Sequence, residues 1–365
     1  MARGPNRPRG LTVLRRDPIE DEMHFRKFYC PPTEPNFTPD AVTPTVQIRR
    51  ELMRNIDLTM PDGREVEMWV VEDPDAPDGE RRQFPSRMVR VSRGEIVHAR
   101  VGAHTNTHTI HWHGIEPCPA HDGVGKSTFE ISGNYTYQWQ PRFSGTYLFH
   151  CHKNTVLHFE MGLYGYLIID PPGTDPNVFP RRAFDGGPVY HVEAFWAGDE
   201  IDSRWHTLGH DAFMRGCDID APFTTDGFLN EFNPDYFVVT GVPSVAGQPI
   251  TDARVTINAV VGQTILIRVL NGGYCIQNYS LPALGAQVIA VDGRALGQAP
   301  FGQYSQPYAL PAGTPLSLTT ARRADLLITP TAAQVGAHRA RVEFVHWISG
   351  EVLHVAETLI QVAAA

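Results

Sequence analysis

From residue 46 onward, short runs rich in apolar, β-branched and aromatic residues alternate with segments rich in Gly, Pro, Asn and Asp. The runs include VQIRRELMRNIDLTM, EVEMWVVE, MVRVSRGEIVHARVG, NYTYQWQP, GTYLFHC and LYGYLIID. Runs of this length and composition are typical of β-strands, and the segments between them are typical of turns. Many short strands with regular turn signals predict a sandwich, so we expect an all-β protein.

The β pattern occurs twice, on either side of the Pro- and Gly-rich segment 171–188. Such internal similarity predicts a duplicated sandwich domain. We therefore expect an N-terminal arm at 1–45, a first domain at 46–170, a linker and irregular connection at 171–235, and a second domain at 236–365. The matched positions, each pair separated by 168 residues, are Gly94 and Gly262, Arg100 and Arg268, and Val101 and Val269.

Composition and charge exclude several classes of protein. The chain has 365 residues, of which 42% are hydrophobic and 19% charged, as in ordinary soluble proteins. No apolar run is long enough for a transmembrane helix, and a net charge of −9 argues against a nucleic-acid partner. We read no signal peptide, so the expected location is the cytoplasm, or the periplasm or exterior if a leader was removed.

The cysteines are too widely spaced for a disulfide framework in a chain of this length. Four of them are expected to be buried apolar side chains, and their spacing does not define a disulfide state. Cys151 differs because it stands between two histidines. The other four are Cys30, Cys118, Cys217 and Cys275.

Two short stretches, HTIHWHGIEP and FHCHKNTVLHFEMGL, hold most of the residues suited to metal binding. Because residues two apart in a strand share a face, each His-X-His pair points one way and Cys151 points the other. Two imidazoles and a thiolate form the donor set of a blue copper site, and four imidazoles next to it suit a second copper centre. The candidate ligands are His108, His111, His113, His150, Cys151, His152 and His158.

These stretches resemble those of the multicopper oxidases, the cupredoxin-fold group that includes laccases and copper nitrite reductases. The resemblance is strong over residues 85–170 and looser over 235–362, in NPDYFVVTG, QTILIRVLNGG and VIAVDGRAL. It implies two cupredoxin-like Greek-key sandwiches that bind copper. It also implies type 1 ligands at His108, Cys151 and His158, a type 2 ligand at His111, and type 3 ligands at His113, His150 and His152.

The same resemblance bears on three further residues. The family's axial type 1 position lies five residues after the second type 1 histidine, which gives Leu163, and we expect Met161 simply to pack. Asp122, in HDGVG, resembles the acidic residue beside the oxygen-reducing copper and could relay protons, although Asp-Gly is also a turn signal. Two-domain members assemble as trimers, and His346 falls on the position of a ligand for the neighbouring chain. The alternative for His346 is a strand residue before a hairpin turn at Ser349-Gly350.

The remaining histidines carry weaker signals. Segment 190–237 fits neither repeat, and we expect it to be a partly helical connection, with His206 and His210 as exposed polar residues. His104 and His121 flank the first motif, and we expect them to be polar surface residues or residues that support the ligands.

The sequence therefore predicts a copper-dependent oxidoreductase, in which electrons pass from a small-molecule reductant through type 1 copper to an adjacent type 2 and/or type 3 centre. Oxygen would be the acceptor, as in laccases, and the assembly a homotrimer. One alternative is a nitrite reductase-like enzyme with a single type 2 copper that acts on nitrite or hydroxylamine. His111 stands where that family has its catalytic Asp, which weighs against this alternative. A second alternative is a non-enzymatic blue copper electron-transfer or copper-binding protein.

Overall fold

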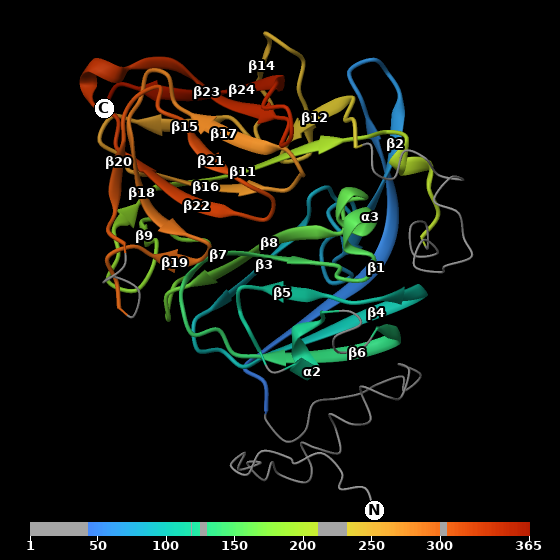
Figure 1. Cartoon of the computed structure of the whole chain (residues 1–365). Helices are drawn as coiled ribbons and strands as arrows, with labels where there is room; N and C mark the ends of the chain where they lie inside the picture. The colour runs from blue at the N-terminus through green and yellow to red at the C-terminus, as the bar shows by residue number, and fades with distance from the viewer. Residues whose placement is uncertain (1–42, 118, 125–129, 211–231, 300–304) are drawn as a thin grey trace, which may run out of the picture.

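The computed structural model describes residues 43–117, 119–124, 130–210, 232–299 and 305–365. Within these ranges the chain forms two β-sandwiches, and the C-terminus lies in the second, upper one in Figure 1. Nearly all of the expected N-terminal arm, together with Cys30, Cys118 and Cys217, falls outside them. None of the helices in these ranges is long and apolar enough to cross a membrane.

The first sandwich consists of two four-stranded sheets, with strand orders β2-β1-β4-β6 and β3-β8-β7-β5. Strands β1 and β4 run parallel, as do β3 and β8, so the chain crosses between the sheets. Aromatic side chains, among them Trp112, Tyr137 and Phe149, fill the space between them. The elements are β1 (Val46–Thr59), β2 (Glu65–Glu72), β3 (Ser86–Ser92), β4 (Val97–His108), β5 (His111–His113), α2 (Pro119–Asp122), β6 (Ile131–Trp139), β7 (Gly145–His150), α3 (Thr155–Glu160) and β8 (Tyr164–Asp170).

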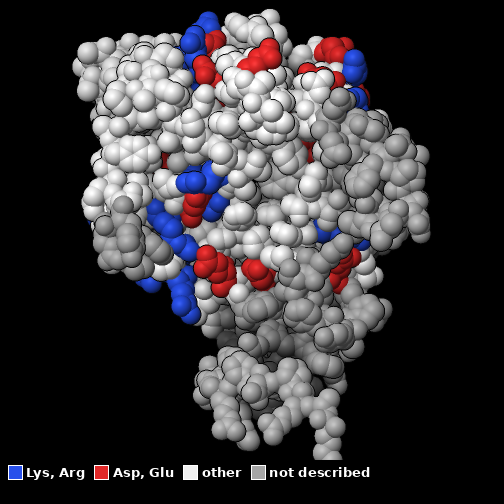
Figure 2. Space-filling model, in the orientation of Figure 1, with Lys and Arg blue, Asp and Glu red and all other residues white. Residues whose placement is uncertain are grey.

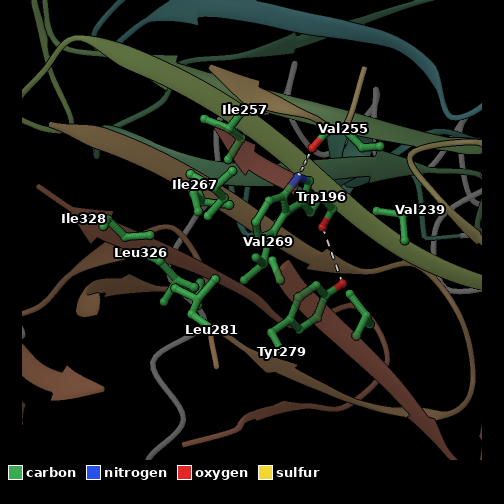
Figure 3. Close-up of a cluster of buried hydrophobic side chains, with 14 of the residues drawn as sticks. Trp196, Val239, Val255, Ile257, Ile267, Val269, Tyr279, Leu281, Leu326 and Ile328 are labelled. Atoms are coloured by element: carbon green, nitrogen blue, oxygen red, sulfur yellow. Dashed lines mark hydrogen bonds between the residues drawn. The ribbon is translucent and has the colours of Figure 1, made fainter. Parts of the chain in front are cut away.

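The second sandwich has one sheet in the order β13-β12-β11-β16-β22-β18-β19 and another in the order β14-β24-β23-β17-β21. Trp196 lies at its centre, and its indole Nε1 donates a hydrogen bond to the Val255 carbonyl at 2.8 Å (Figure 3). Strand β20 pairs with β18, and β15 pairs with β24.

The elements of the second sandwich and of the chain that leads into it are as follows. They are β9 (Arg181–Arg182), β10 (Val189–Tyr190), β11 (Val192–Ile201), η1 (Trp205–Thr207), β12 (Tyr236–Val239), β13 (Val242–Pro243), β14 (Pro249–Ile250), β15 (Ile257–Val260), β16 (Ile265–Asn271), β17 (Ile276–Ser280), β18 (Ala286–Val291), β19 (Arg294–Ala295), β20 (Tyr308–Leu310), β21 (Leu316–Leu318), β22 (Arg323–Ile328), η3 (Ala332–Gln334), β23 (Gly336–Val345) and β24 (Val352–Ala363).

Strand pairing confirms the internal repeat. Strand β1 pairs antiparallel with β2 and parallel with β4, and β11 pairs in the same two ways with β12 and β16. Val46 lies opposite Val97 in the first copy, and Val192 lies opposite Ile265 in the second. Val97 and Ile265 are separated by the spacing that relates the two sequence patterns.

This pairing corrects one expectation about the chain's organisation. Residues 192–201 fall in the range 171–235 that was expected to be a linker and irregular connection, but they form β11 in the centre of a sheet. Most of β11 is buried, so the strand lacks the apolar–polar alternation that would mark a half-exposed strand.

Buried polar contacts join the two sandwiches. Arg268 on β16 is fully buried and donates to Thr146 Oγ1 on β7 at 2.8 Å and to Glu193 Oε1 on β11 at 2.7 Å. It also pairs with Asp325 on β22 at 3.2 Å. Burial raises the pKa of Glu193, but its pairs with Arg268 and Arg90 outweigh this effect and lower the pKa to about 2.

The surface in Figure 2 carries acidic and basic side chains next to one another. Neither sign of charge forms a continuous surface on this face of the molecule.

We predict that Arg268→Met lowers the free energy of unfolding by about 3–5 kcal/mol, because the carboxylates of Glu193 and Asp325 would stay buried without their shared partner. Urea unfolding followed by circular dichroism measures the change. Arg254→Met removes an exposed ion pair with Asp252 and serves as the control, with an expected loss below about 1 kcal/mol. Equal losses in the two variants would contradict a stabilising role for the buried network.

Candidate metal centre

Cys151 and two histidines come together at one end of the first sandwich. His108 is the last residue of β4, Cys151 follows β7, and His158 lies on α3. The Cys151 Sγ atom lies 3.6 Å from His108 Nδ1 and 3.3 Å from His158 Nδ1. All three side chains are fully buried. They form the Cys151 site.

Backbone carbonyls fix the orientation of both imidazoles in the Cys151 site. His108 Nε2 donates to the Thr105 carbonyl at 3.2 Å, and His158 Nε2 donates to the His210 carbonyl at 3.0 Å. Since a carbonyl only accepts, the proton of each neutral ring is on Nε2 and the lone pair on Nδ1 faces the sulfur. Burial, with His158 and His210 nearby, holds the pKa of His108 well below its usual range. The two rings are therefore arranged as metal ligands.

The thiol completes this donor set. Burial raises the pKa of the Cys151 thiol to about 11 in the metal-free protein. A coordinated thiol is a thiolate, so metal binding would release this proton. Two neutral imidazoles and one thiolate fit a blue copper site better than a structural zinc site, which usually has four ligands.

Leu163 and Met161 lie beside the Cys151 site, and both side chains are fully buried. The Leu163 backbone contacts two of the ligand residues: its carbonyl accepts from the Cys151 amide at 2.9 Å, and its amide donates to the His158 carbonyl at 3.0 Å. The Met161 carbonyl instead accepts from the Trp69 amide at 2.6 Å. Assignment of Leu163 to the axial position remains a prediction.

Four imidazoles gather on the other side of β7. Strands β5 and β7 are antiparallel with His111 opposite His150, which brings the two His-X-His pairs together. His113 Nδ1 lies 3.3 Å from His150 Nε2, and the ring centroids of His111 and His152 are 5.5 Å apart. His111, His113 and His150 each place a ligand atom within 4.8 Å of the others. His111, His113, His150 and His152 form the histidine cluster, on the face that strand alternation predicts.

Hydrogen bonds also orient rings of the histidine cluster. His111 Nδ1 donates to the Asp122 carbonyl at 2.8 Å, and His150 Nδ1 donates to the Cys151 carbonyl at 2.9 Å. These bonds leave Nε2 of each ring for a metal. Burial and the neighbouring His111 and His113 keep the pKa of His150 well below its usual range. Burial and Arg323 lower the pKa of His113 to about 3. Both rings are therefore neutral near pH 7.

Asp122, the last residue of the short helix α2, lies at the edge of the histidine cluster. Asp122 Oδ1 lies 3.3 Å from His111 Nδ1. Gly123 has φ +70°, and a Cβ there would lie 1.7 Å from the Ile110 carbonyl oxygen. Only glycine allows this close approach, so Gly123 permits the chain to leave α2 with Asp122 beside His111.

His206 and His210 were expected to be exposed, and this expectation is wrong: each is only 7% exposed. The His210 ring packs 4.6 Å from the His158 ring, measured between centroids, and its carbonyl holds His158 Nε2. His206 Nδ1 donates to the Glu67 carbonyl at 2.6 Å, and its Nε2 lies 3.5 Å from Glu160 Oε1. Segment 202–210 thus folds back over the Cys151 site, which no local sequence pattern indicates.

Two supporting residues complete the surroundings. Lys153, which the sequence analysis missed, is buried, donates to Thr107 Oγ1 and pairs with Glu130 at 3.2 Å. Its position two residues after Cys151 was the only available signal. His121 is buried, and its Nδ1 accepts from the Gln138 amide at 3.0 Å. The side chain of His104 lies outside what the structure describes.

His346 precedes the turn between β23 and β24. Its Nδ1 accepts from the Ser349 amide at 3.1 Å, and its ring stacks on Trp347 with centroids 4.6 Å apart. Within the described ranges, neither group of ligands includes His346. The hairpin agrees with the second interpretation of this residue, and a ligand role toward a neighbouring chain stays a prediction.

Comparison with known proteins shows that the part of the chain that holds these two sites is similar to a known family. The model of the multicopper oxidase family matches residues 61–174, which include every candidate ligand of the first sandwich. Copper resistance protein A of Pseudomonas syringae pv. tomato is 32% identical over 130 residues, which are 33% of this chain and 21% of that protein. The aligned part thus spans about a fifth of that relative.

Solved structures show the same fold over most of the chain. Blue copper oxidase from Nitrosomonas europaea has a TM-score of 0.62 and 18% identity, covering 87% of this chain and 86% of its own. Copper nitrite reductase from the same organism has a TM-score of 0.58 and 17% identity, covering 87% of this chain and 94% of its own. The chain therefore has the two-domain cupredoxin fold, and residues 61–174 match the model of the multicopper oxidase family.

Proposed function

We propose that the protein is a laccase-like oxidoreductase that transfers electrons from a small reductant to oxygen. The main support is the position of Cys151, whose sulfur belongs to one site while its carbonyl orients His150 in the other. Copper bound at both sites would supply one-electron transfer at Cys151 and reduction of the acceptor at the histidine cluster. We assign type 1 ligands to His108, Cys151 and His158 with Leu163 axial, a type 2 ligand to His111, and type 3 ligands to His113, His150 and His152.

Covalent connection between the sites favours electron transfer between them. Cys151 is bonded directly to His150 and His152, so the path from the sulfur to either imidazole follows the backbone and a side chain. The hydrogen bond from His150 Nδ1 to the Cys151 carbonyl adds a second, shorter link. The chain holds His150 and Cys151 buried at the end of β7, with His152 partly buried beside them.

The reductant does not touch the ligands of the Cys151 site, since these side chains are fully buried. The His210 carbonyl covers His158 Nε2, the ring atom that points away from the sulfur. Val156, two residues before His158, is 51% exposed. We propose that the reductant reacts near Val156 and that the electron crosses the short segment from there to His158.

Asp122 is suited to supply protons on the acceptor side. Its carboxylate is partly exposed and lies 3.3 Å from His111 Nδ1, so it contacts both solvent and the edge of the histidine cluster. Its backbone carbonyl already fixes the His111 tautomer. The side chain is therefore free to exchange protons while the ring stays in place.

The first sandwich supplies four imidazoles to the histidine cluster. The corresponding positions of the second sandwich do not hold histidines. Ile276, Tyr279 and Leu281 stand where the repeat would place His108, His111 and His113, and Tyr279 and Leu281 are buried in the core. We propose a homotrimer in which His346 of a neighbouring copy adds a ligand. Its Nδ1 already accepts backbone hydrogen bonds, which leaves Nε2 as the ligand atom.

The same shortage of imidazoles favours one alternative, a nitrite reductase-like enzyme with a single type 2 copper. We predict oxygen uptake with a one-electron donor such as hexacyanoferrate(II), because four clustered imidazoles exceed the needs of one copper. An oxygen electrode measures this uptake, and anaerobic assays with nitrite or hydroxylamine are the comparison. Turnover of either nitrogen compound without oxygen uptake would favour the alternative.

We predict that Cys151→Ser abolishes both the intense blue absorption and turnover, because an alcohol cannot replace the thiolate in the type 1 donor set. Absorption spectra and steady-state assays on copper-loaded protein measure the two effects. Cys275→Ser is the matched control, since Cys275 is also a buried free cysteine but lies in the second sandwich, and we expect it to keep both properties. Oxidase activity retained by Cys151→Ser would contradict the proposed function.

We predict that Asp122→Asn slows turnover by roughly 10²-fold or more, the usual scale of general acid–base catalysis, without changing the blue absorption. The pH profile of turnover should also change if this carboxylate relays the proton. Glu116→Gln, an exposed acid in the same connection, is the control and should leave the rate and the pH profile unchanged. An unchanged pH profile in Asp122→Asn would show that the Asp122 carboxylate does not relay the proton.

A further inference from the structure

A cavity of about 500 Å³ opens beside the histidine cluster, at the boundary between the two sandwiches. Its floor is the turn Gly114–Pro117, which directly follows His113. Apolar walls come from Trp139, Phe143 and Tyr147, and Arg294 of β19 reaches in from the second sandwich. The candidate ligands described above do not line this cavity, so it is a separate feature.

The cavity is electropositive in a chain whose net charge is −9. Arg142 and Arg294 both line it, and among the described residues Glu116, which is exposed, is its only acidic lining residue. In the part of the chain that the structure describes, Arg142 has no hydrogen bond or ion pair. Its guanidinium is therefore available to an external anion.

Arg294 is also positioned to bind an anion in this cavity. It donates to the Tyr147 hydroxyl at 2.6 Å and to the Gly114 carbonyl at 3.2 Å, and its guanidinium lies 4.7 Å from the centroid of the Phe143 ring. A guanidinium fixed over an aromatic ring presents a planar set of donors beside an apolar surface. This combination suits a ligand that has a planar anionic group joined to an apolar body.

A third arginine adds to the positive charge around the turn. Gly114 has φ +91°, and a Cβ at this position would lie 3.3 Å from an Arg323 guanidinium nitrogen and 3.0 Å from Tyr147 Cδ1. Arg323 and Arg322 both pair with the carboxylate of Asp292. One negative charge is therefore shared between two guanidinium groups. The arginines of the second sandwich thus surround the turn that follows His113.

We propose that this cavity binds a small organic carboxylate. Arg142 and Arg294 would hold the carboxylate group, since charge-assisted hydrogen bonds from guanidinium groups are strong and directional. Trp139, Phe143 and Tyr147 would contact the apolar body. The volume is within the range of small-molecule sites and exceeds what an inorganic anion fills. Because Arg294 also holds Gly114, the bound carboxylate would stabilise the turn next to the histidine cluster.

Benzoate is a suitable probe, and binding is measured by calorimetry on the full chain without added metal, so that the test does not depend on the proposed redox function. Trp139 lines the cavity, and its ring centroid lies 5.0 Å from that of Trp112. A change in tryptophan fluorescence on binding therefore reports whether benzoate occupies the cavity. We expect saturable benzoate binding that weakens with salt. Arg142→Gln should raise the Kd about tenfold or more, because it removes a charged hydrogen-bond donor.

Three comparisons make this proposal falsifiable. Arg142→Lys should retain part of the affinity, and Arg182→Gln, which removes an exposed arginine on β9, should leave it unchanged. Benzyl alcohol, which has the same ring without the charge, should not bind. Equal binding of benzyl alcohol and benzoate, an unchanged Kd in Arg142→Gln, or tighter binding of inorganic phosphate than of benzoate would each overturn the proposal.

Discussion

Both candidate copper sites depend on the alternation of side chains at the end of β7. His150 and His152 point to one face of this segment and Cys151 to the other, so a single stretch of chain contributes to both sites. The antiparallel pairing of β5 with β7 then sets His111 opposite His150. No flexible loop separates the two sites, and their relative position follows from the geometry of one pair of strands.

The surrounding structure keeps this strand end in place. Thr146 and Tyr147, earlier in β7, make hydrogen bonds to Asp325 and to the Gly293 carbonyl in the second sandwich. The second sandwich has no histidine at the positions that match His108, His111 and His113, but it contains a buried charge network centred on Arg268. It also supplies Arg294, which bonds to the turn after His113. Its role in a single chain is thus to support the first sandwich.

Much of the fold could be predicted because the informative patterns are local. Strand alternation placed Cys151 opposite to His150 and His152, and the repeat identified Arg268 as the counterpart of Arg100. The Asp-Gly signal marked the end of the short helix α2, whose last residue is Asp122. These features depend on residues that are close in sequence or on a regular period, which is the information that a single sequence carries.

The features that the sequence did not reveal depend on contacts between distant segments. Strand β11 was missed because a central strand buried on both faces lacks alternation. His206 and His210 were misplaced because their burial requires segment 202–210 to fold against Glu67 and His158, far away in the sequence. Lys153 was missed because its partner Glu130 lies on another segment. The ligand role of His346 depends on another copy of the chain, which one sequence does not specify.

The number of copper ions per chain tests most directly whether the histidine cluster is a complete oxygen-reducing centre. We expect about four per chain in fully loaded, pure protein, one at the Cys151 site and the remainder at the histidine cluster. The intense blue absorption should accompany this value. About two copper ions per chain would contradict the laccase-like assignment and favour a single catalytic copper, shared between neighbouring chains through His346.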